Sequence, residues 1–152
     1  MLAVLFSQLE GGALMADQPG LMPTGISRKQ FEVLVEYASQ AETLEADDLL
    51  RRVMRHLEDA RVAHSRSRIV NLRLATAIAS VAEKLLAEWA SIAVQYRNWL
   101  GGAILYFAES RDSEHDFSSA IGFEDDAEVM NACLKLAGKS SFCIKIEDFD
   151  DA

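Results

Sequence analysis

The chain has 152 residues, 50% hydrophobic and 26% charged, so it is long enough to bury one core and too apolar to be disordered throughout. Its net charge of −9 argues against a protein that coats nucleic acid or an anionic membrane. Two cysteines, Cys133 and Cys143, exclude a disulfide scaffold and favour a reducing compartment, so we expect a cytoplasmic protein.

Residues 1–25 are predicted to form a mobile N-terminal segment. They hold both prolines and four of the eight glycines and show no sustained period, apart from one apolar stretch, 2–9, that could dock. The start lacks the basic region of a signal peptide, and Met15 is an alternative to Met1 as the first residue. The longest uncharged run, 98–108, is too short to span a bilayer.

Two helices are predicted after this segment. Ser27 and Gln30 are spaced as a capping box, and apolar residues then recur at helical spacing to residue 41. A second helix is expected over residues 44–64. Its first turn is acidic and its last part is basic, which suits the helix dipole.

A third helix, residues 68–100, is predicted to lie at the centre of the fold. Its polar residues form one narrow line, so protein must cover its other faces. At 1.5 Å per residue it would measure roughly 45–50 Å, which is long for so small a domain, and we therefore expect a break. Gly101 and Gly102 are the clearest place for it, with a short helix, 103–108, after them.

The last third is predicted to contain a polar loop, 112–121, and a helix over 123–136 that Gly138 ends. Residues 141–146 alternate like a strand but lack a partner strand, so we expect an extended segment packed on helices. An acidic tail, 147–152, follows. The pattern predicts an all-α fold: a single compact domain of about four to five helices over residues 26–146, with one long central apolar helix.

The most specific signature lies within residues 100–134. A tyrosine and a phenylalanine end an apolar helix, and aspartates at fixed spacing and an Ile-Gly-Phe turn follow. This pattern resembles the YkvA-like family, a small bacterial helical domain of unknown function. The matching positions are Tyr106, Phe107, Asp112, Asp116, Phe117, Ile121, Gly122, Phe123, Asp125, Asp126 and Ala127.

The resemblance implies a helical fold more than an activity, because the activity of the family is itself unsettled. The family's loop between the two helices is rich in proline and apolar residues. Here residues 110–119 are mostly polar and contain no proline. The resemblance therefore implies a wetter and more mobile loop in this chain.

The four aspartates of the signature have two interpretations. Converging oxygen ligands would suit Mg²⁺ or Ca²⁺ rather than Zn²⁺, although no EF-hand spacing is present. Alternatively, the adjacent pair opens a helix, where negative charge is favourable by ~0.3–1 kcal/mol each, and the other two cap helices. Capping is the favoured interpretation and the metal site stays open. The four are Asp112, Asp116, Asp125 and Asp126.

The other residues that could carry chemistry give weaker signals. His56, His64 and His115 are expected at the surface, and neither cysteine has a nucleophile–base setting. Residues 51–73 contain seven arginines and two acidic residues. They include no aromatic residue that could stack on a base, so nucleic acid is a disfavoured partner. We expect these arginines to face the acidic C-terminal third or the solvent.

The acidity of the chain is concentrated in that third. Up to Phe107 there are 11 basic and 12 acidic residues, net −1, whereas the remainder has 4 basic and 12 acidic residues, net −8. The tail is predicted to be solvated and to recognise a partner, because charges there would speed association with a basic protein. Its carboxylates are Glu147, Asp148, Asp150 and Asp151.

Three functions are compatible with these features. No nucleophile, general base or phosphate-binding loop can be assembled, so the sequence favours a non-enzymatic interaction or regulatory module with a protein partner. The alternatives are a carboxylate-based enzyme that binds a divalent metal, and an acidic immunity or inhibitor protein that binds a basic partner. No cofactor is expected unless the aspartates bind Mg²⁺ or Ca²⁺. Peripheral contact with a membrane stays open.

Overall fold

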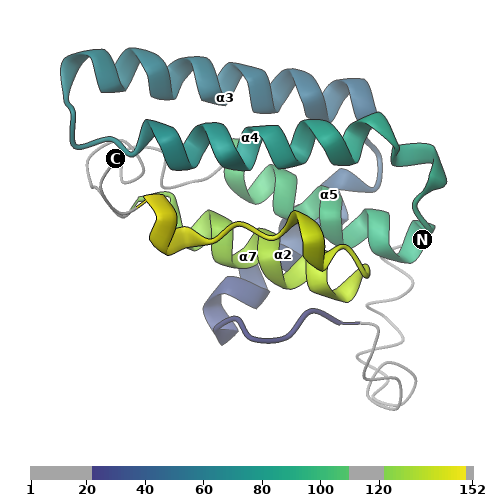
Figure 1. Ribbon diagram of the computed structural model, residues 1–152. Helices are drawn as coiled ribbons and strands as arrows, with labels where there is room; N and C mark the ends of the chain where they lie inside the picture. The colour runs from purple at the N-terminus through teal and green to yellow at the C-terminus, as the bar shows by residue number, and fades with distance from the viewer. Residues whose placement is uncertain (1–21, 110–121, 150–152) are drawn as a thin grey trace.

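A computed structural model of the chain describes residues 22–109 and 122–149, and the regular structure in these ranges is entirely helical (Figure 1). The predicted all-α fold is therefore confirmed for these residues. Most of the N-terminal segment, the loop 112–121 and the tail end 150–152 lie outside them. The α-helices are α2 (Arg28–Ala41), α3 (Ala46–Arg66), α4 (Leu72–Ala87), α5 (Val94–Ala108) and α7 (Glu124–Leu136). The short 3₁₀ helices are η2 (Trp89–Ser91), η3 (Ser140–Phe142) and η4 (Ile146–Phe149).

The first helix begins where the sequence predicts, the second begins at Ala46 rather than at residue 44, and each has a cap. The Ser27 hydroxyl accepts from the Gln30 N–H at 3.0 Å, and the Gln30 side chain accepts from the Ser27 N–H at 2.8 Å, which confirms the capping box. In α3 the Asp48 carboxylate accepts from the Glu45 N–H at 3.0 Å. This bond, with help from Arg51, holds the pKa of Asp48 below its usual range.

The long helix predicted over residues 68–100 is divided in the structure. Helix α4 ends at Ala87, η2 follows, and α5 starts at Val94 and returns to pack on α2, α3 and α7 (Figure 1). Between them Ile92 is extended, with φ −87° and ψ 133°, and only 7% exposed. The turn lets the second half of the apolar sequence enter the core, whereas a straight helix would carry it past the other helices. None of the helices in the described ranges is long and apolar enough to cross a membrane.

Gly101 and Gly102 do not break a helix, and the predicted short helix 103–108 is the last part of α5. Both glycines lie in the middle of α5 where it crosses α2. A β-carbon built on Gly102 would lie 2.8 Å from the Cα and N atoms of Ala38. The glycines therefore allow the two helices to pack closely. Their low helix propensity by itself predicts a break in the helix instead.

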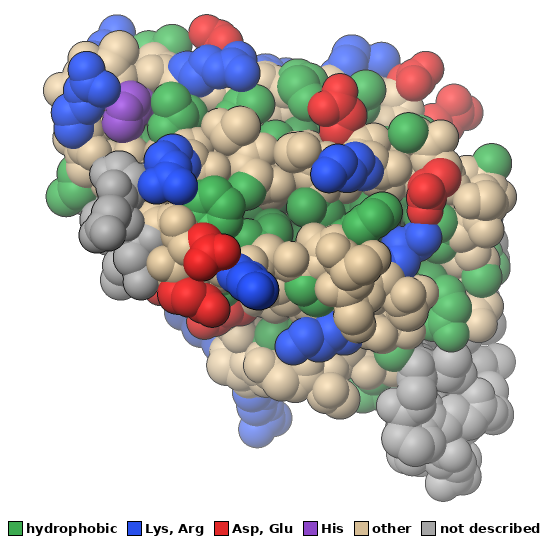
Figure 2. Space-filling model, viewed as in Figure 1, with side chains coloured by type: hydrophobic (Ala, Val, Ile, Leu, Met, Phe, Trp, Pro, Cys, Tyr) green, Lys and Arg blue, Asp and Glu red, His purple; other side chains and the backbone are tan. Residues whose placement is uncertain are grey.

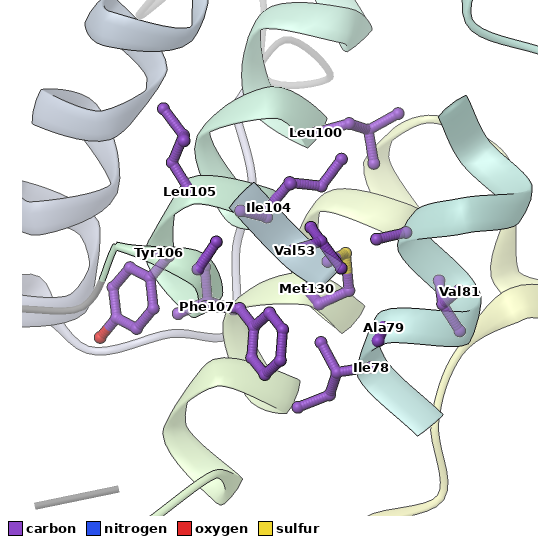
Figure 3. Close-up of a cluster of buried hydrophobic side chains, with 14 of the residues drawn as sticks. Val53, Ile78, Ala79, Val81, Leu100, Ile104, Leu105, Tyr106, Phe107 and Met130 are labelled. Atoms are coloured by element: carbon purple, nitrogen blue, oxygen red, sulfur yellow. The ribbon is translucent and has the colours of Figure 1, made fainter. Parts of the chain in front are cut away.

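Helix α5 supplies much of the core. Every residue from Asn98 to Ala108 is buried. Figure 3 shows Ile104 and Phe107 of α5 among Val53 of α3, Ile78 of α4 and Met130 of α7, all buried. The central element is thus a helix of 15 residues covered by its neighbours, rather than one long helix.

The C-terminal segment packs on the helices without a strand, as predicted, but it is extended only over residues 143–145, because η3 and η4 take up the rest of the stretch. Gly138, with φ 75°, ends α7 in a Schellman motif: the Lys139 N–H donates to the Leu134 carbonyl at 2.8 Å. The Asn131 amide then binds both backbone groups of Ile144, each at 2.8 Å. One side chain thereby replaces the strand partner that the alternating residues 141–146 lack.

Candidate functional site

Two signature residues, Tyr106 of α5 and Asp125 of α7, meet where α5 and α7 lie next to α2. The Tyr106 hydroxyl donates to the Asp125 carboxylate at 2.6 Å, and the Gln30 amide of α2 donates to the other oxygen of Asp125. The same amide donates to Glu128 at 3.0 Å. Both Asp125 oxygens therefore accept hydrogen bonds that tie α7 to α5 and α2. Figure 3 shows the Tyr106 hydroxyl directed away from the Phe107 ring.

The remaining described signature residues belong to the core. Gly122, Phe123 and Ala127 are buried, and Asp126 is only 2% exposed. The ring centroids of Phe107 and Phe123 are 5.8 Å apart. The two aromatic rings thus pack the end of α5 against the start of α7.

His56 packs against these two rings and is buried, so the prediction of a surface histidine is wrong there. Its ring meets Phe107 edge-on, with centroids 4.9 Å apart. His56 lies on the face of α3 that carries Val53, Leu57 and Ala60, all buried. The helical period alone places His56 on the buried face of α3, whereas the polarity of histidine favours the surface. His64 is half-buried, and His115 lies outside the described residues.

The metal hypothesis rests on two described and two undescribed aspartates. Asp125 and Asp126 lie in the first turn of α7, as the capping interpretation requires. The helix dipole stabilises negative charge at this end of a helix. In residues 22–109 and 122–149, no group of three or more histidine, cysteine or acidic side chains could hold a metal ion. Asp112, Asp116, Phe117 and Ile121 lie outside these ranges, so the described residues do not complete a site for Mg²⁺ or Ca²⁺.

Two arginines of α3 face the C-terminal end of α5. Arg52 and Arg55 lie 3.7 and 3.6 Å from the two oxygens of Glu109. The Tyr37 hydroxyl donates to the Glu109 carbonyl at 2.6 Å. This part of the arginine-rich stretch does face an acidic residue of the last third, as the sequence predicts.

The acidic tail begins with a backbone anchor. The Asn71 amide donates to the Phe149 carbonyl at 2.9 Å, while its oxygen caps α4 by accepting from the Leu74 N–H at 3.0 Å. The Arg73 guanidinium lies 5.4 Å from the centre of the Phe149 ring and 3.5 Å from the Asp148 carbonyl oxygen. The segment is thus held through its carbonyls and one ring.

The described carboxylates of this segment take no part in these contacts. Glu147 and Asp148 are exposed, as predicted, and neither forms an ion pair with a cation of the described residues. Asp150 and Asp151 lie beyond the described residues. Sequence reasoning missed Asn71 and Phe149, although an asparagine just before an apolar helical run is an N-cap signal.

A groove of about 490 Å³ lies between the end of α3, one face of α4 and the Phe149 ring. Its lining is largely apolar, from Leu72, Ala77 and Phe149, with His64 and Arg73 at its edge. Figure 2 shows hydrophobic surface between α4 and the C-terminal segment, with basic and acidic side chains around it.

In residues 22–109 and 122–149 these features define an all-helical arrangement in which several polar side chains tie helices together. No family model, curated protein or solved structure matches the chain.

Proposed function

We propose that this protein is a non-enzymatic interaction module, similar to the YkvA-like domain, that binds a basic protein partner through its acidic C-terminal segment. One observation supports this most: Glu147 and Asp148 are exposed and unpaired among the described residues, on a segment anchored to α4. Intramolecular stability does not require their charges. An anchored segment that presents free carboxylates loses little conformational freedom when a partner binds.

The signature residues support a structural role. Asp125 uses both oxygens to join three helices, and the aromatic pair Phe107 and Phe123 closes the core beneath it. A catalytic carboxylate needs an oxygen directed at a substrate or a metal. This use of Asp125, together with the exposed acidic segment, supports the proposal of a non-enzymatic module.

The partner can be isolated by immobilising the full chain on a resin and passing a lysate of the source organism over it. We expect a basic protein to bind the parent and to bind the double variant Glu147→Gln/Asp148→Gln less. The matched control is Asp59→Asn/Glu83→Gln, which removes two exposed carboxylates from α3 and α4. Equal retention of the partner by both variants would exclude the C-terminal segment as the binding surface.

Association kinetics with the purified partner then test the electrostatic role. Steering by surface charge raises association rates by 10- to 1,000-fold in favourable cases, so two of these charges should contribute roughly threefold to tenfold. The C-terminal double variant should associate more slowly and respond less to salt, whereas the control should match the parent. If the captured protein is an enzyme that loses activity on binding, the chain is an inhibitor that uses the same surface.

A further inference from the structure

The turn between α3 and α4 forms a basic corner, which we define as Arg61, His64, Arg66, Arg68 and Arg73. Residues 60–82 contain these four arginines and no acidic residue. The four arginines are exposed, and in Figure 2 basic side chains gather with a histidine at the end of the molecule where α3 meets α4. Among the described residues only Arg61 pairs with a carboxylate, that of Glu58 at 3.2 Å. The corner therefore keeps most of its positive charge.

Two large apolar side chains are exposed on this corner. Ile69 is 48% exposed in the turn, directly after Arg68, and Val62 is 42% exposed on the last turns of α3. The next residue, Val70, is fully buried. Because Val70 is buried, the side chain of Ile69 is exposed. This apolar side chain lies between Arg68 and Arg73 in the sequence.

The conformation of the turn is fixed by hydrogen bonds. The Val70 carbonyl oxygen lies 3.0 Å from His64 Nδ1, and an Arg68 guanidinium nitrogen lies 3.2 Å from His64 Nε2. Because the guanidinium can only donate, Nε2 accepts and Nδ1 carries the proton that binds the carbonyl. The side chain of Ile69 therefore projects from an ordered turn, and presenting it costs little conformational entropy.

We propose that the basic corner binds an anionic lipid surface, with the arginines on the headgroups and Ile69 and Val62 inserted at the boundary with the acyl chains. Arginines beside exposed apolar residues match the two components of interfacial binding, charge attraction and apolar burial. The groove that Arg73 and Leu72 line, about 490 Å³, continues the apolar surface next to the corner. A site for single-stranded nucleic acid would use stacking aromatic residues, and none is exposed on this corner.

The charge of the whole molecule makes this proposal specific. At net −9 the chain is repelled by an anionic membrane in most orientations. Binding must therefore occur through the corner, and it must be sensitive to the arginines there. The acidic segment beside Arg73 should oppose it, so neutralising Glu147 and Asp148 should strengthen membrane binding. The same substitutions weaken the protein interaction proposed above, so the two surfaces can be tested separately.

The test is co-sedimentation of the full chain with two kinds of vesicle. One is made of phosphatidylcholine alone, and the other of phosphatidylcholine with roughly one-third phosphatidylserine. We expect binding to the anionic vesicles only, and less of it as salt rises above ~0.1 M. Each arginine near an anionic surface is worth about fivefold in partitioning, so Arg66→Gln/Arg68→Gln should lower the partition coefficient about 30-fold. Ile69→Ser, which leaves the charge unchanged, should lower it several-fold.

The matched control is Lys29→Gln/Lys84→Gln, which removes two exposed charges away from the corner. It should partition as the parent does, and circular dichroism should show every variant folded, since all the substituted side chains are exposed. No binding of the parent to anionic vesicles at low salt would overturn the proposal, as would an equal loss in the control. A corner that retains poly-glutamate or an oligonucleotide through Arg66 and Arg68, but no vesicle, would also overturn it.

Discussion

At Gly101 and Gly102 the absence of a β-carbon determines how closely α5 approaches α2. A β-carbon on Gly101 would lie 2.8 Å from the Ala41 β-carbon, and one on Gly102 would lie 2.8 Å from backbone atoms of Ala38. The first clash is with a methyl group that can be removed by mutation. The second is with backbone, which only a movement of the helix can relieve.

This difference predicts opposite outcomes for two double variants. Gly102→Ala should destabilise the protein by roughly 1–3 kcal/mol through overpacking, although alanine favours a helix interior over glycine by about 1 kcal/mol. Ala41→Gly should rescue Gly101→Ala, whereas Ala38→Gly should not rescue Gly102→Ala. Denaturant midpoints of the single and double variants give the coupling energies. A midpoint raised by Gly102→Ala alone would show that the helices are not in close contact.

The two cysteines should differ in reactivity. Burial raises the pKa of the Cys133 thiol, and partial burial raises that of Cys143 while nearby Lys135 opposes it. In the native protein iodoacetamide should label Cys143 first. In a Cys143→Ser variant, Cys133 should be labelled only after denaturant is added. Equal labelling of both native cysteines would contradict the burial of Cys133.

The raised pKa of Cys133 also predicts how stability depends on pH. In the unfolded chain the thiol ionises above its ordinary pKa of about 8.5, whereas in the folded protein it stays protonated. The free energy of unfolding should therefore be unaffected by this group below that pH and fall as the pH rises above it. Cys133→Ala should remove this part of the alkaline slope in denaturant titrations.

At the level of elements, local signals predicted the start of α2 and the end of α7. The capping box at Ser27 and the Schellman glycine at Gly138 involve residues three to five positions apart, so the sequence contains the whole interaction. The turn between α4 and α5 contains no glycine or proline, and its cause is the burial of Ile92 and of α5 against helices distant in sequence. A single-sequence pattern cannot show such packing.

Helix α5 begins at a position that offers no side-chain cap. Ala93, the N-cap residue, is exposed and has extended backbone angles, φ −59° and ψ 143°. Ala93→Ser would supply an oxygen for the free N–H groups of the first turn and should stabilise the protein by about 1 kcal/mol. The control Ala90→Ser places the same hydroxyl in η2, where no helix begins, and should leave the denaturant midpoint unchanged. Equal midpoints for both variants would place the start of α5 elsewhere.

At the level of the whole molecule, the candidate site was predicted only in part. Solvation of Glu147 and Asp148 follows from composition, because a run of acidic residues after the last apolar stretch cannot be buried. The anchor could not be foreseen, because Asn71 and Phe149 are separated by 78 residues. The same limit applies to Gln30 and Asp125, which are 95 residues apart.

A metal titration tests the alternative function of the signature aspartates. We expect the melting temperature to be the same in millimolar Mg²⁺, in millimolar Ca²⁺ and in EDTA at matched ionic strength, because Asp125 already binds Tyr106 and Gln30. A metal at 100 times its dissociation constant would add about 2.7 kcal/mol, which shifts a domain of this size by several degrees. A rise of that size, lost in Asp125→Asn, would establish a metal site and contradict the purely structural role.

Asn71 connects the C-terminal segment to the α3–α4 turn, and its two bonds can be separated by mutation. Asn71→Ser keeps an N-cap oxygen for α4 but cannot reach the Phe149 carbonyl, whereas Asn71→Ala loses both bonds. In the full chain Asn71→Ser should cost about 1 kcal/mol, the usual value of one hydrogen bond. In a chain truncated after Ile146 the same substitution should cost almost nothing, because its partner is gone. Asn71→Ala should cost about 1 kcal/mol more than Asn71→Ser in both chains.

Denaturant midpoints of the six proteins complete this cycle. An equal cost of Asn71→Ser in the full and truncated chains would show that the segment is not tied to Asn71. The predicted pattern would identify the segment as a clasp on the start of α4, held by backbone and ring contacts that leave its carboxylates free. In that case the carboxylates can be neutralised without unfolding the protein, as the binding experiments require.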